Sequence, residues 1–199
     1  TQQALVVDPG DEAPAIIKAL TRLGVTAVKL VHTHAHFDHI GATGAVAAQT
    51  GAEIWLHKDD RWLYDNAALQ AQMFGLPPPA PLPPPTHEIA SDEVLSFGRR
   101  EARALHTPGH TPGSVCFFVE SPGDTPILFA GDTLFKGSIG RTDLWGGSFP
   151  QITSSIQQRL FTLPDQTIVV PGHGPETTLA YEKEENPFVG KRAQKGPIA

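Results

Sequence analysis

The sequence has little of three things: it holds one cysteine, no long apolar run and no excess of basic residues. The lone Cys116 cannot form an internal disulfide, and this suits a reducing compartment. No stretch approaches the roughly 18 apolar residues of a membrane-spanning helix, so we expect no membrane partner. No charged and then apolar leader opens the chain, so we expect no secretion. These observations together predict a cytoplasmic protein.

The charge balance argues against a nucleic-acid partner. Lysine and arginine total 15 against 21 aspartates and glutamates, and the basic residues are scattered along the chain. No basic stripe is therefore present to neutralise phosphates. The length of 199 residues fits one domain, and an apolar content of 40% suits a globular core. We expect residues 1–199 to form a single domain.

Strand and helix patterns alternate along the whole chain. Short apolar runs predict strands, and longer segments with apolar residues at helical spacing predict helices. The predicted strands cover residues 5–7, 25–31, 53–56, 94–97, 101–105, 114–119, 126–130 and 167–170. The predicted helices cover residues 8–24, 41–51, 58–75, 150–163 and 177–185. Intermixed strands and helices indicate an α/β or α+β fold with a mixed sheet.

Two further segments have distinct compositions. TQQALVVDPG at the start is typical of a hairpin arm followed by a strand, and we expect the partner strand upstream. PPPAPLPPP at 77–85 cannot be a helix or an interior strand, because proline lacks the amide donor. It could dock an SH3-like partner, but we favour a stiff surface connection inside the domain.

The most unusual stretch is VHTHAHFDH at 31–39, which carries four of the nine histidines. Alternate residues of an extended segment face the same way, so either His32 with His34 or His34 with His36 could share a face. The Asp38-His39 pair favours the second register, because it adds a carboxylate and a third imidazole within a tight turn. His32 then becomes the last residue of the strand rather than a metal ligand.

Three other polar residues follow predicted strands beside glycine or proline: His110 in HTPGHTPGS, Asp132 in GDTLF and His173 in PGHGP. Loops at strand ends are where a sheet gathers side chains that are distant in sequence, and glycine lets the backbone turn sharply. We expect these residues to join the histidine cluster at one site. His57 and His106 could orient ligands from behind, and His87 follows the proline run.

The inventory of five histidines and two aspartates, without cysteine, suits zinc, iron, manganese or cobalt. Seven ligands exceed the four of a closed structural zinc site, whereas two metals that share a carboxylate would use them all. Two adjacent cations can bridge a water, lower its pKa towards roughly 7 and polarise a carbonyl for attack by hydroxide. The sequence therefore predicts a binuclear hydrolytic centre.

In these motifs the sequence resembles the metallo-β-lactamase superfamily, whose pattern is HxHxDH, then His, Asp and His. The resemblance covers nearly the whole chain and implies an αββα sandwich of two mixed β-sheets flanked by helices. It implies that one metal is held by His34, His36 and His110 and the other by Asp38, His39 and His173. Asp132 would bridge the two metals. By this resemblance we expect the first strand of the family to be absent or truncated in this sequence.

Within the superfamily, FKGSIGRTD and PGHGPETTLAYEKEENPF resemble the short bacterial glyoxalase II type, the hydroxyacylglutathione hydrolases. The resemblance implies hydrolysis of S-D-lactoylglutathione or a related acyl-thiol thioester, with two divalent metals, zinc by preference and iron or manganese as alternatives. Asp38 would orient the attacking water and take up its proton. Arg141 is the best candidate to contact an anionic substrate, since guanidinium matches carboxylate, and Lys136 and Tyr181 are lesser candidates.

Other functions compete with this interpretation. A persulfide dioxygenase with mononuclear iron shares the fold and resembles the chain in HTPGHTPGS and GRTD. Lactonases use the same ligands on an oxygen ester, whereas many lactamases of the superfamily place a cysteine where Asp132 stands. A metal-stabilised binding module that docks partners on the proline run is a non-catalytic alternative, but structural metal sites are normally closed by fewer ligands.

Overall fold

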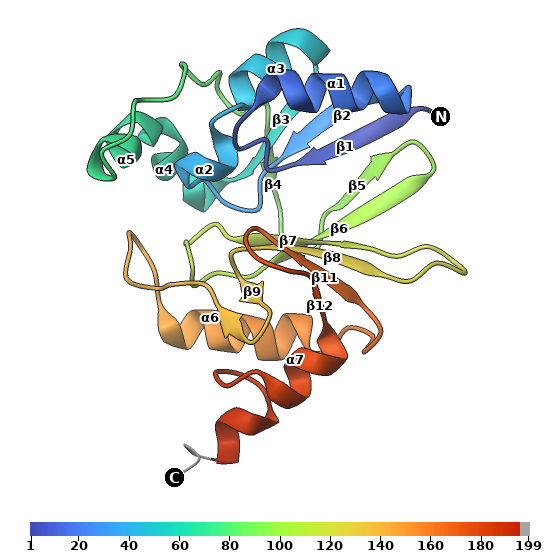
Figure 1. Ribbon diagram of the computed structural model, residues 1–199, viewed down its shortest axis with the longest axis vertical. Coiled ribbons are helices and arrows are strands. Elements are labelled where there is room, and N and C mark those ends of the chain that lie inside the picture. The colour runs from blue at the N-terminus through green and yellow to red at the C-terminus, as the bar shows by residue number, and fades with distance from the viewer. Residues whose placement is uncertain (196–199) are drawn as a thin grey trace.

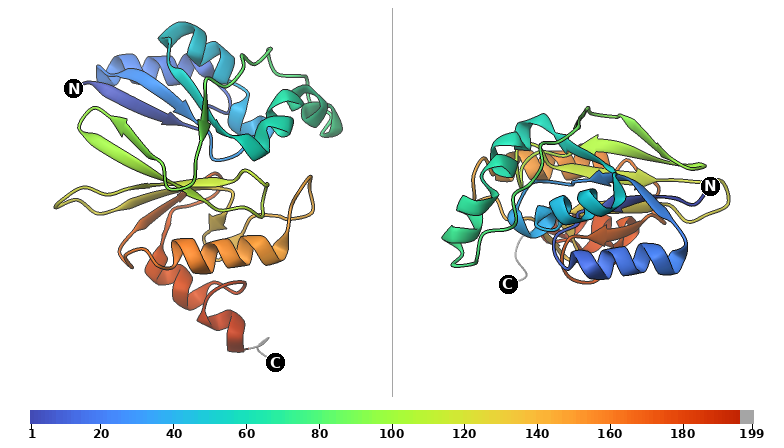
Figure 2. Two further views of the ribbon diagram at one scale, coloured as in Figure 1. Left: turned by 180° about the vertical axis from the view of Figure 1, so that it is seen from behind. Right: turned by 90° about the horizontal axis from the view of Figure 1, so that it is seen from above.

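A computed structural model describes residues 1–195, which are arranged in four layers (Figure 1). Two β-sheets face each other in the middle of the molecule. Helices α1 (Ala13–Leu23) and α3 (Thr43–Thr50) cover the outer face of the first sheet. Helices α6 (Phe149–Ser155) and α7 (Leu179–Glu185) lie on the opposite side of the molecule, beyond the second sheet (Figure 2). The predicted αββα sandwich is confirmed.

The first sheet has the strand order β1-β2-β3-β4, with β1 (Gln3–Val7), β2 (Thr26–Val31), β3 (Glu53–His57) and β4 (His87–Ile89). All three strand pairs are parallel, so this sheet is not mixed, contrary to the expectation from the resemblance. The reason is that a crossover passage of chain separates each strand from the next, as parallel pairing requires. β1 pairs with β2 and lies at the edge of the sheet.

The second sheet is mixed, as expected, and has the order β12-β11-β8-β7-β6-β5. Its strands are β5 (Val94–Phe97), β6 (Arg100–His106), β7 (Val115–Val119), β8 (Ile127–Gly131), β11 (Ile168–Pro171) and β12 (Thr177–Thr178). Only the β11–β8 pair is parallel among the recorded pairs of this sheet. A small hairpin of β9 (Leu134–Phe135) and β10 (Ser138–Ile139) follows β8.

Each predicted helix is present, but α1, α3 and α7 are shorter than predicted, and residues 177–178 form β12 rather than the start of α7. Gly24 ends α1 with a φ of 65°, a left-handed conformation that suits glycine. The predicted helix over 58–75 is divided at Asn66 into α4 (Arg61–Asp65) and α5 (Ala67–Met73), preceded by a 3₁₀ turn at Lys58–Asp60. Helix α6 continues as a π-helical segment, Ile156–Leu160, and a 3₁₀ segment covers Lys191–Lys195.

The proline run has no regular secondary structure and lies mostly exposed between α5 and β4. The hydroxyl of Tyr64 donates to the carbonyl oxygen of Pro83 at 2.8 Å, and Leu82 packs against the core between the first sheet and its covering helices. These contacts hold the segment against the protein, as expected of a surface connection. No helix within residues 1–195 is long and apolar enough to cross a membrane.

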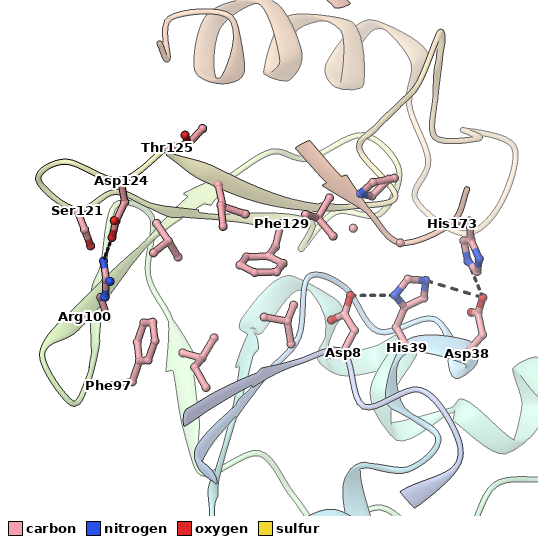
Figure 3. A pocket seen from close by; sticks show the side chains of 18 residues that line it. Asp8, Asp38, His39, Phe97, Arg100, Ser121, Asp124, Thr125, Phe129 and His173 are labelled. Atoms are coloured by element: carbon pink, nitrogen blue, oxygen red, sulfur yellow. Dashed lines mark hydrogen bonds and ion pairs between the residues drawn. The ribbon is translucent and has the colours of Figure 1, made fainter. Parts of the chain in front are cut away.

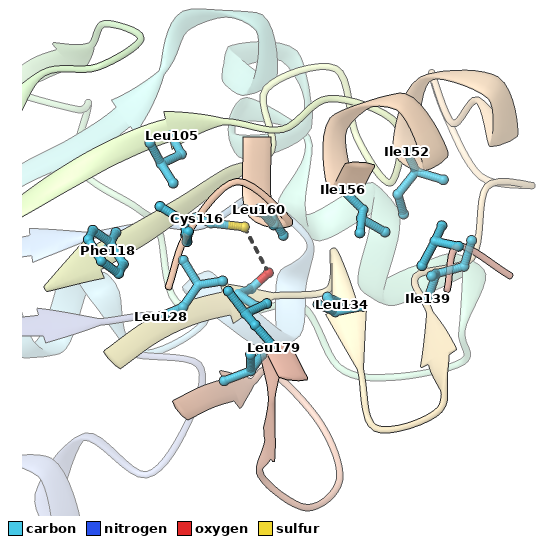
Figure 4. Close-up of a cluster of buried hydrophobic side chains, with 14 residues drawn as sticks. Leu105, Cys116, Phe118, Leu128, Leu134, Ile139, Ile152, Ile156, Leu160 and Leu179 are labelled. Carbon is cyan, nitrogen blue, oxygen red and sulfur yellow. Dashed lines mark hydrogen bonds between the residues drawn. The ribbon is translucent and has the colours of Figure 1, made fainter. Parts of the chain in front are cut away.

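Three apolar clusters hold the layers together. One lies between the first sheet and helices α1 and α3, a second between the two sheets, and a third between the second sheet and α6 and α7. Cys116 belongs to the third cluster, where its thiol donates to the carbonyl oxygen of Ala130 (Figure 4). With both faces of the second sheet packed, the loops at its strand ends have a rigid base.

Candidate metal centre

The HTHAHFDHIG segment leaves β2 as extended chain and then forms α2 (Phe37–Ile40), a single helical turn. His34 and His36 lie on the extended part, and Asp38 and His39 lie within the turn. The turn packs against the Asp-Pro-Gly corner that follows β1, where an added Cβ on Gly10 would lie 1.9 Å from the carbonyl oxygen of Asp38. Only glycine permits this approach, so the corner fixes where the turn sits.

A first group consists of His34, His36 and His110, all buried. His110 Nε2 lies 2.9 Å from His36 Nδ1 and 3.2 Å from His34 Nε2. Burial and the neighbouring imidazoles lower the pKa of His34 well below its usual value and that of His36 to about 3. Burial also lowers the pKa of His110. All three rings are therefore neutral at neutral pH, as imidazole must be to bind a metal cation.

A second group consists of Asp38, His39 and His173. His173 Nε2 lies 3.1 Å from Asp38 Oδ2, and His39 Nε2 lies 3.8 Å from the same oxygen (Figure 3). Burial opposes protonation of His39, but the hydrogen bond and charge of Asp8 outweigh it and raise the pKa of His39 to about 9. A cation bound here would displace the proton from Nε2, because Nδ1 stays engaged with Asp8.

Asp132 lies between the two groups. Its Oδ1 is 3.5 Å from His39 Nε2, and its Oδ2 is 3.7 Å from His110 Nε2 and 3.8 Å from His173 Nε2. Two glycines allow the close packing around Asp132. A Cβ on Gly131 would lie 2.2 Å from Thr33 Oγ1, and a Cβ on Gly172 would lie 2.3 Å from Asp132 Oδ1. One carboxylate therefore faces ligand atoms of both groups.

Three of the imidazole rings have a polar partner at Nδ1 on the side away from the cluster, so that Nε2 faces the cluster. His39 Nδ1 donates to Asp8 Oδ2 at 2.9 Å, and His110 Nδ1 donates to the carbonyl oxygen of Arg141 at 2.8 Å. His34 Nδ1 lies 3.1 Å from the hydroxyl of Thr33, whose own proton goes to Asp8. Partners of this kind fix the orientation of imidazole ligands.

The donor set fits a metal centre. Among residues 1–195, the buried side-chain atoms without a hydrogen-bond partner are His36 Nε2, His39 Nε2 and Asp132 Oδ1. A buried polar atom left without a partner costs about 1–3 kcal/mol, and all three orphans lie in this one cluster. Nitrogen and oxygen atoms in this arrangement are ligands for zinc, iron or manganese. The structure thus brings together all seven residues that the sequence proposes as metal ligands.

The remaining histidines lie elsewhere. His32 follows the last residue of β2 and is fully buried, with Nδ1 2.9 Å from the carbonyl oxygen of Trp55 and Nε2 2.8 Å from Thr43 Oγ1. His57 and His106 stack on each other at 4.1 Å between ring centroids. One recorded ring nitrogen of each pairs with the amide of Asp59 and the carbonyl oxygen of Pro112, and neither of these bonds goes to a proposed ligand.

A cleft of about 690 Å³ opens between the two sheets beside the second group. Apolar side chains of β1, β5, β7, β8 and β11 line most of it, and the ion pair of Arg100 and Asp124 lies at the end far from His173 (Figure 3). The side chains of Asp38 and His173 are 40% and 58% exposed, whereas the first group is buried. The second group is therefore the more accessible of the two.

The Metallo-beta-lactamase superfamily model matches residues 1–173, a span that contains every proposed ligand. The chain belongs to the metallo-β-lactamase superfamily. Two relatives are similar over nearly their whole length. One is "Probable metallo-hydrolase YqgX" of Bacillus subtilis, 40% identical over 94% of this chain and 87% of the relative. The other is "Hydroxyacylglutathione hydrolase GloC" of Haemophilus influenzae, 36% identical over 96% and 90%.

Solved structures of the superfamily agree with the fold. The B3 metallo-β-lactamase BLEG-1 superposes with a TM-score of 0.86 at 40% identity, covering 94% of this chain and 89% of that one. TTHA1623 in a di-iron-bound form superposes with a TM-score of 0.78 at 39% identity, covering 92% and 87%. This superfamily member is therefore a metal-dependent hydrolase by family, and the identity of its metal is a separate question.

Of the three proposed substrate contacts, Arg141 and Lys136 lie on loops and Tyr181 lies on helix α7. Arg141 makes a two-pronged ion pair with Asp143 at 2.7 and 2.8 Å, and both side chains are exposed. Lys136 lies on the turn between β9 and β10, with its Nζ 5.9 Å from the ring centroid of Tyr181. The guanidinium of Arg141 is thus already paired with Asp143. The backbone carbonyl oxygen of Arg141 accepts the hydrogen bond from His110 Nδ1.

Sequence reasoning missed Asp8 and Thr33. Asp8 accepts hydrogen bonds from the amide of Thr33 at 2.7 Å, the hydroxyl of Thr33 at 2.6 Å and His39 Nδ1. A usable signal was present, because Asp8 directly follows a predicted strand and precedes Pro-Gly, the same strand-end pattern that singled out Asp132 and His173.

Proposed function

We propose that this protein is a binuclear metallohydrolase that cleaves a thioester such as S-D-lactoylglutathione or a related acyl-thiol. The observation that carries the proposal is the position of Asp132, which faces ligand atoms of both groups, so that the cluster has a place for two cations that share one carboxylate. The similarity to the Haemophilus hydroxyacylglutathione hydrolase supports the substrate class.

In this proposal His34, His36 and His110 would hold one cation and Asp38, His39 and His173 the other, and Asp132 would be shared between them. Two divalent cations supply a hydroxide nucleophile at neutral pH and polarise the carbonyl that it attacks. Zinc is our first choice because imidazole and carboxylate suit it, and the di-iron form of TTHA1623 makes iron the main alternative, with manganese behind it.

The side chains of the protein have separate tasks. The carboxylate of Asp38 orients the attacking water and takes up its proton, and its partial exposure beside His173 places it where substrate arrives. Asp8, through His39, keeps the second group in register. The leaving thiolate needs no strong general acid, so the site requires no further titratable group. Lys136 and Tyr181 are the proposed contacts for the anionic part of the thiol, and Arg141 joins them only by giving up its ion pair with Asp143.

Metal analysis combined with a substrate panel tests the proposal. The purified protein is assayed with S-D-lactoylglutathione, other acyl-thiols, a lactone and nitrocefin, and oxygen uptake is followed with glutathione persulfide. We expect about two metal ions per chain and the highest kcat/KM with a thioester. Oxygen uptake without thioester cleavage would replace the proposal with a dioxygenase.

Ligand variants test the mechanism. His110→Ala and Asp132→Ala should each lower thioester kcat/KM by more than about 100-fold, since losing even an outer partner of a ligand costs roughly 10–100-fold. His87→Ala is the matched control, because His87 stacks on Trp55 outside the cluster, and it should keep its activity. Full activity in either ligand variant would show that the binuclear centre is not used.

A second candidate function is β-lactam hydrolysis. It is favoured by the likeness to BLEG-1, at 40% identity and a TM-score of 0.86. The hydroxide that the bound cations would supply is also a suitable nucleophile for the amide carbonyl of a strained ring. The nitrocefin arm of the panel discriminates the two: a kcat/KM for nitrocefin above that for every thioester would make the lactam the substrate class.

A further inference from the structure

Asp60 is fully buried between the 3₁₀ turn at Lys58–Asp60 and helix α4, and its carboxylate accepts three hydrogen bonds. Oδ2 accepts from the amide of Ala35 at 2.9 Å and from the hydroxyl of Thr111 at 2.8 Å. Oδ1 accepts from the amide of Gly113 at 2.6 Å. Burying a carboxylate costs desolvation free energy, so its presence here in place of a neutral residue needs a physical reason.

The three donors lie on the two segments that carry the first group. Ala35 stands between His34 and His36, and Thr111 follows His110. The hydroxyl of Thr111 also lies 2.8 Å from the hydroxyl of Ser114. The Ser114 hydroxyl accepts a hydrogen bond from the amide of Thr111 at 3.0 Å, and these two contacts stabilise the loop. An added Cβ on Gly113 would lie 2.7 Å from the Asp60 carboxylate, so glycine is needed for this approach.

We propose that Asp60 is a positioning residue that sets the geometry of the His34, His36 and His110 group by tying its two chain segments to one carboxylate. Oδ2 accepts from both segments, so this one atom links the segment of His34 and His36 to the loop of His110. The recorded hydrogen bonds of Asp60 include none to Asp38, His39 or His173. The inference rests on the metal centre of the proposed function and not on its substrate.

The test measures zinc affinity at each group separately. His173→Ala leaves the first group as the stronger site, and His110→Ala leaves the second. Asp60→Asn is added to each background and zinc is titrated against a chromophoric chelator. Asn keeps the shape of Asp but turns one acceptor into a donor that faces an N–H or hydroxyl. Asp59→Asn is the matched control, because the side chain of Asp59 is 45% exposed and lies beside His57.

We expect Asp60→Asn to weaken zinc binding about 10–100-fold in the His173→Ala background and to leave it unchanged in the His110→Ala background. Asp59→Asn should change neither. An equal loss in both backgrounds would show a general structural role, and no loss in either would show none; each outcome overturns the proposal. The melting temperatures of the metal-free variants are recorded alongside, and a change in these alone also counts against it.

A second variant covers the case in which Asp60→Asn does not fold. Thr111→Val removes one donor, keeps the side-chain shape and should weaken zinc in the His173→Ala background by less than Asp60→Asn, with the same selectivity. A site-selective loss in a protein that hydrolyses no thioester would support the positioning role while the proposed function fails. Absence of zinc binding in both backgrounds with Asp60 intact would remove the metal centre and this inference together.

Discussion

Oδ2 of Asp8 lies 2.9 Å from His39 Nδ1 and accepts the hydroxyl proton of Thr33 at 2.6 Å. One oxygen atom therefore connects the corner after β1 to the metal-binding turn after β2. It fixes the His39 ring so that Nε2 points towards Asp132, at 3.5 Å from Oδ1. The first strand of the structure thus takes part in the site although it carries none of the proposed ligands.

Replacing Asp8 should weaken metal binding at the group of Asp38, His39 and His173. In Asp8→Asn the shape is kept, but His39 loses a charged acceptor, and we expect zinc affinity to fall about 10–100-fold. The measurement is competition with a chelator in the His110→Ala background. Asp11→Asn is the control, because Asp11 is exposed and bonds the amide of Glu12 next to it. Equal affinities for Asp8→Asn and the control would contradict the role given to Asp8.

Metal removal should lower the melting temperature. Ligands that bind the folded state at 100 to 1,000 times their dissociation constant stabilise it by about 2.7–4.1 kcal/mol. For a chain of this length each kcal/mol corresponds to roughly 2–4 °C, so dialysis against a chelator should lower the melting temperature by about 5–15 °C. Calorimetry before and after zinc is restored checks this, and a chelator-insensitive melting temperature would count against a bound metal.

His32 and His36 should respond oppositely to replacement by leucine. His32→Leu removes the ring partner of the Thr43 hydroxyl and one of the two donors to the carbonyl oxygen of Trp55, which keeps the backbone amide of residue 32, so it should cost about 1–3 kcal/mol of unfolding free energy. Its metal content should stay that of the wild type. His36→Leu should lose bound metal instead. Metal analysis with urea unfolding separates the two, and loss of metal in His32→Leu would reverse the choice of register.

Gly131 and Gly51 form a matched pair for substitution by alanine. Both have positive φ, 48° and 69°, so alanine at either position carries the same left-handed strain of about 1–2 kcal/mol. Only at Gly131 would the Cβ also lie 2.2 Å from Thr33 Oγ1, whereas nothing lies within 4 Å at Gly51. Gly131→Ala should therefore destabilise the protein more and lower activity, because Asp132 follows directly. Equal unfolding free energies would be the contrary result.

Cys116 should make the protein less stable at high pH. Burial raises the pKa of its thiol to about 11. In the unfolded chain the cysteine thiol ionises near pH 8.5. The neutral thiol therefore contributes its full stabilisation below that pH, and this contribution is lost as the pH rises towards 11. Between pH 8 and pH 10 the wild type should lose about 1–2 kcal/mol more than Cys116→Ala, as measured by urea unfolding. A parallel decline in both proteins would show that the thiol does not titrate in this way.

Much of the candidate site follows from local sequence patterns. His110, Asp132 and His173 could be placed because each follows an apolar run and stands beside glycine or proline, which are signals that a single segment carries. Asp38 and His39 settled the register of the histidine run in the same way. The αββα arrangement followed from the resemblance, whereas the alternation of strands and helices gave only an α/β or α+β class.

The parts that could not be predicted depend on contacts between distant segments. Asp60 is an ordinary carboxylate in KDDR until Ala35 and Gly113 are seen to approach it from two other loops. Arg141 has the right chemistry for an anion, but its pairing with Asp143 is decided by the local turn. The purely parallel pairing of the first sheet likewise depends on which strands become neighbours.

The proposed centre also joins parts of the chain that are very far apart. Asp38 meets His173 across 135 residues, and His34 meets His110 across 76. Contacts of such range close large loops, whose entropic cost must be met before the contacts stabilise the fold. A cation held by either group would therefore act as a reversible cross-link between distant segments, comparable to a disulfide over a long loop. Zinc release would then report directly on the separation of the two halves of the sandwich.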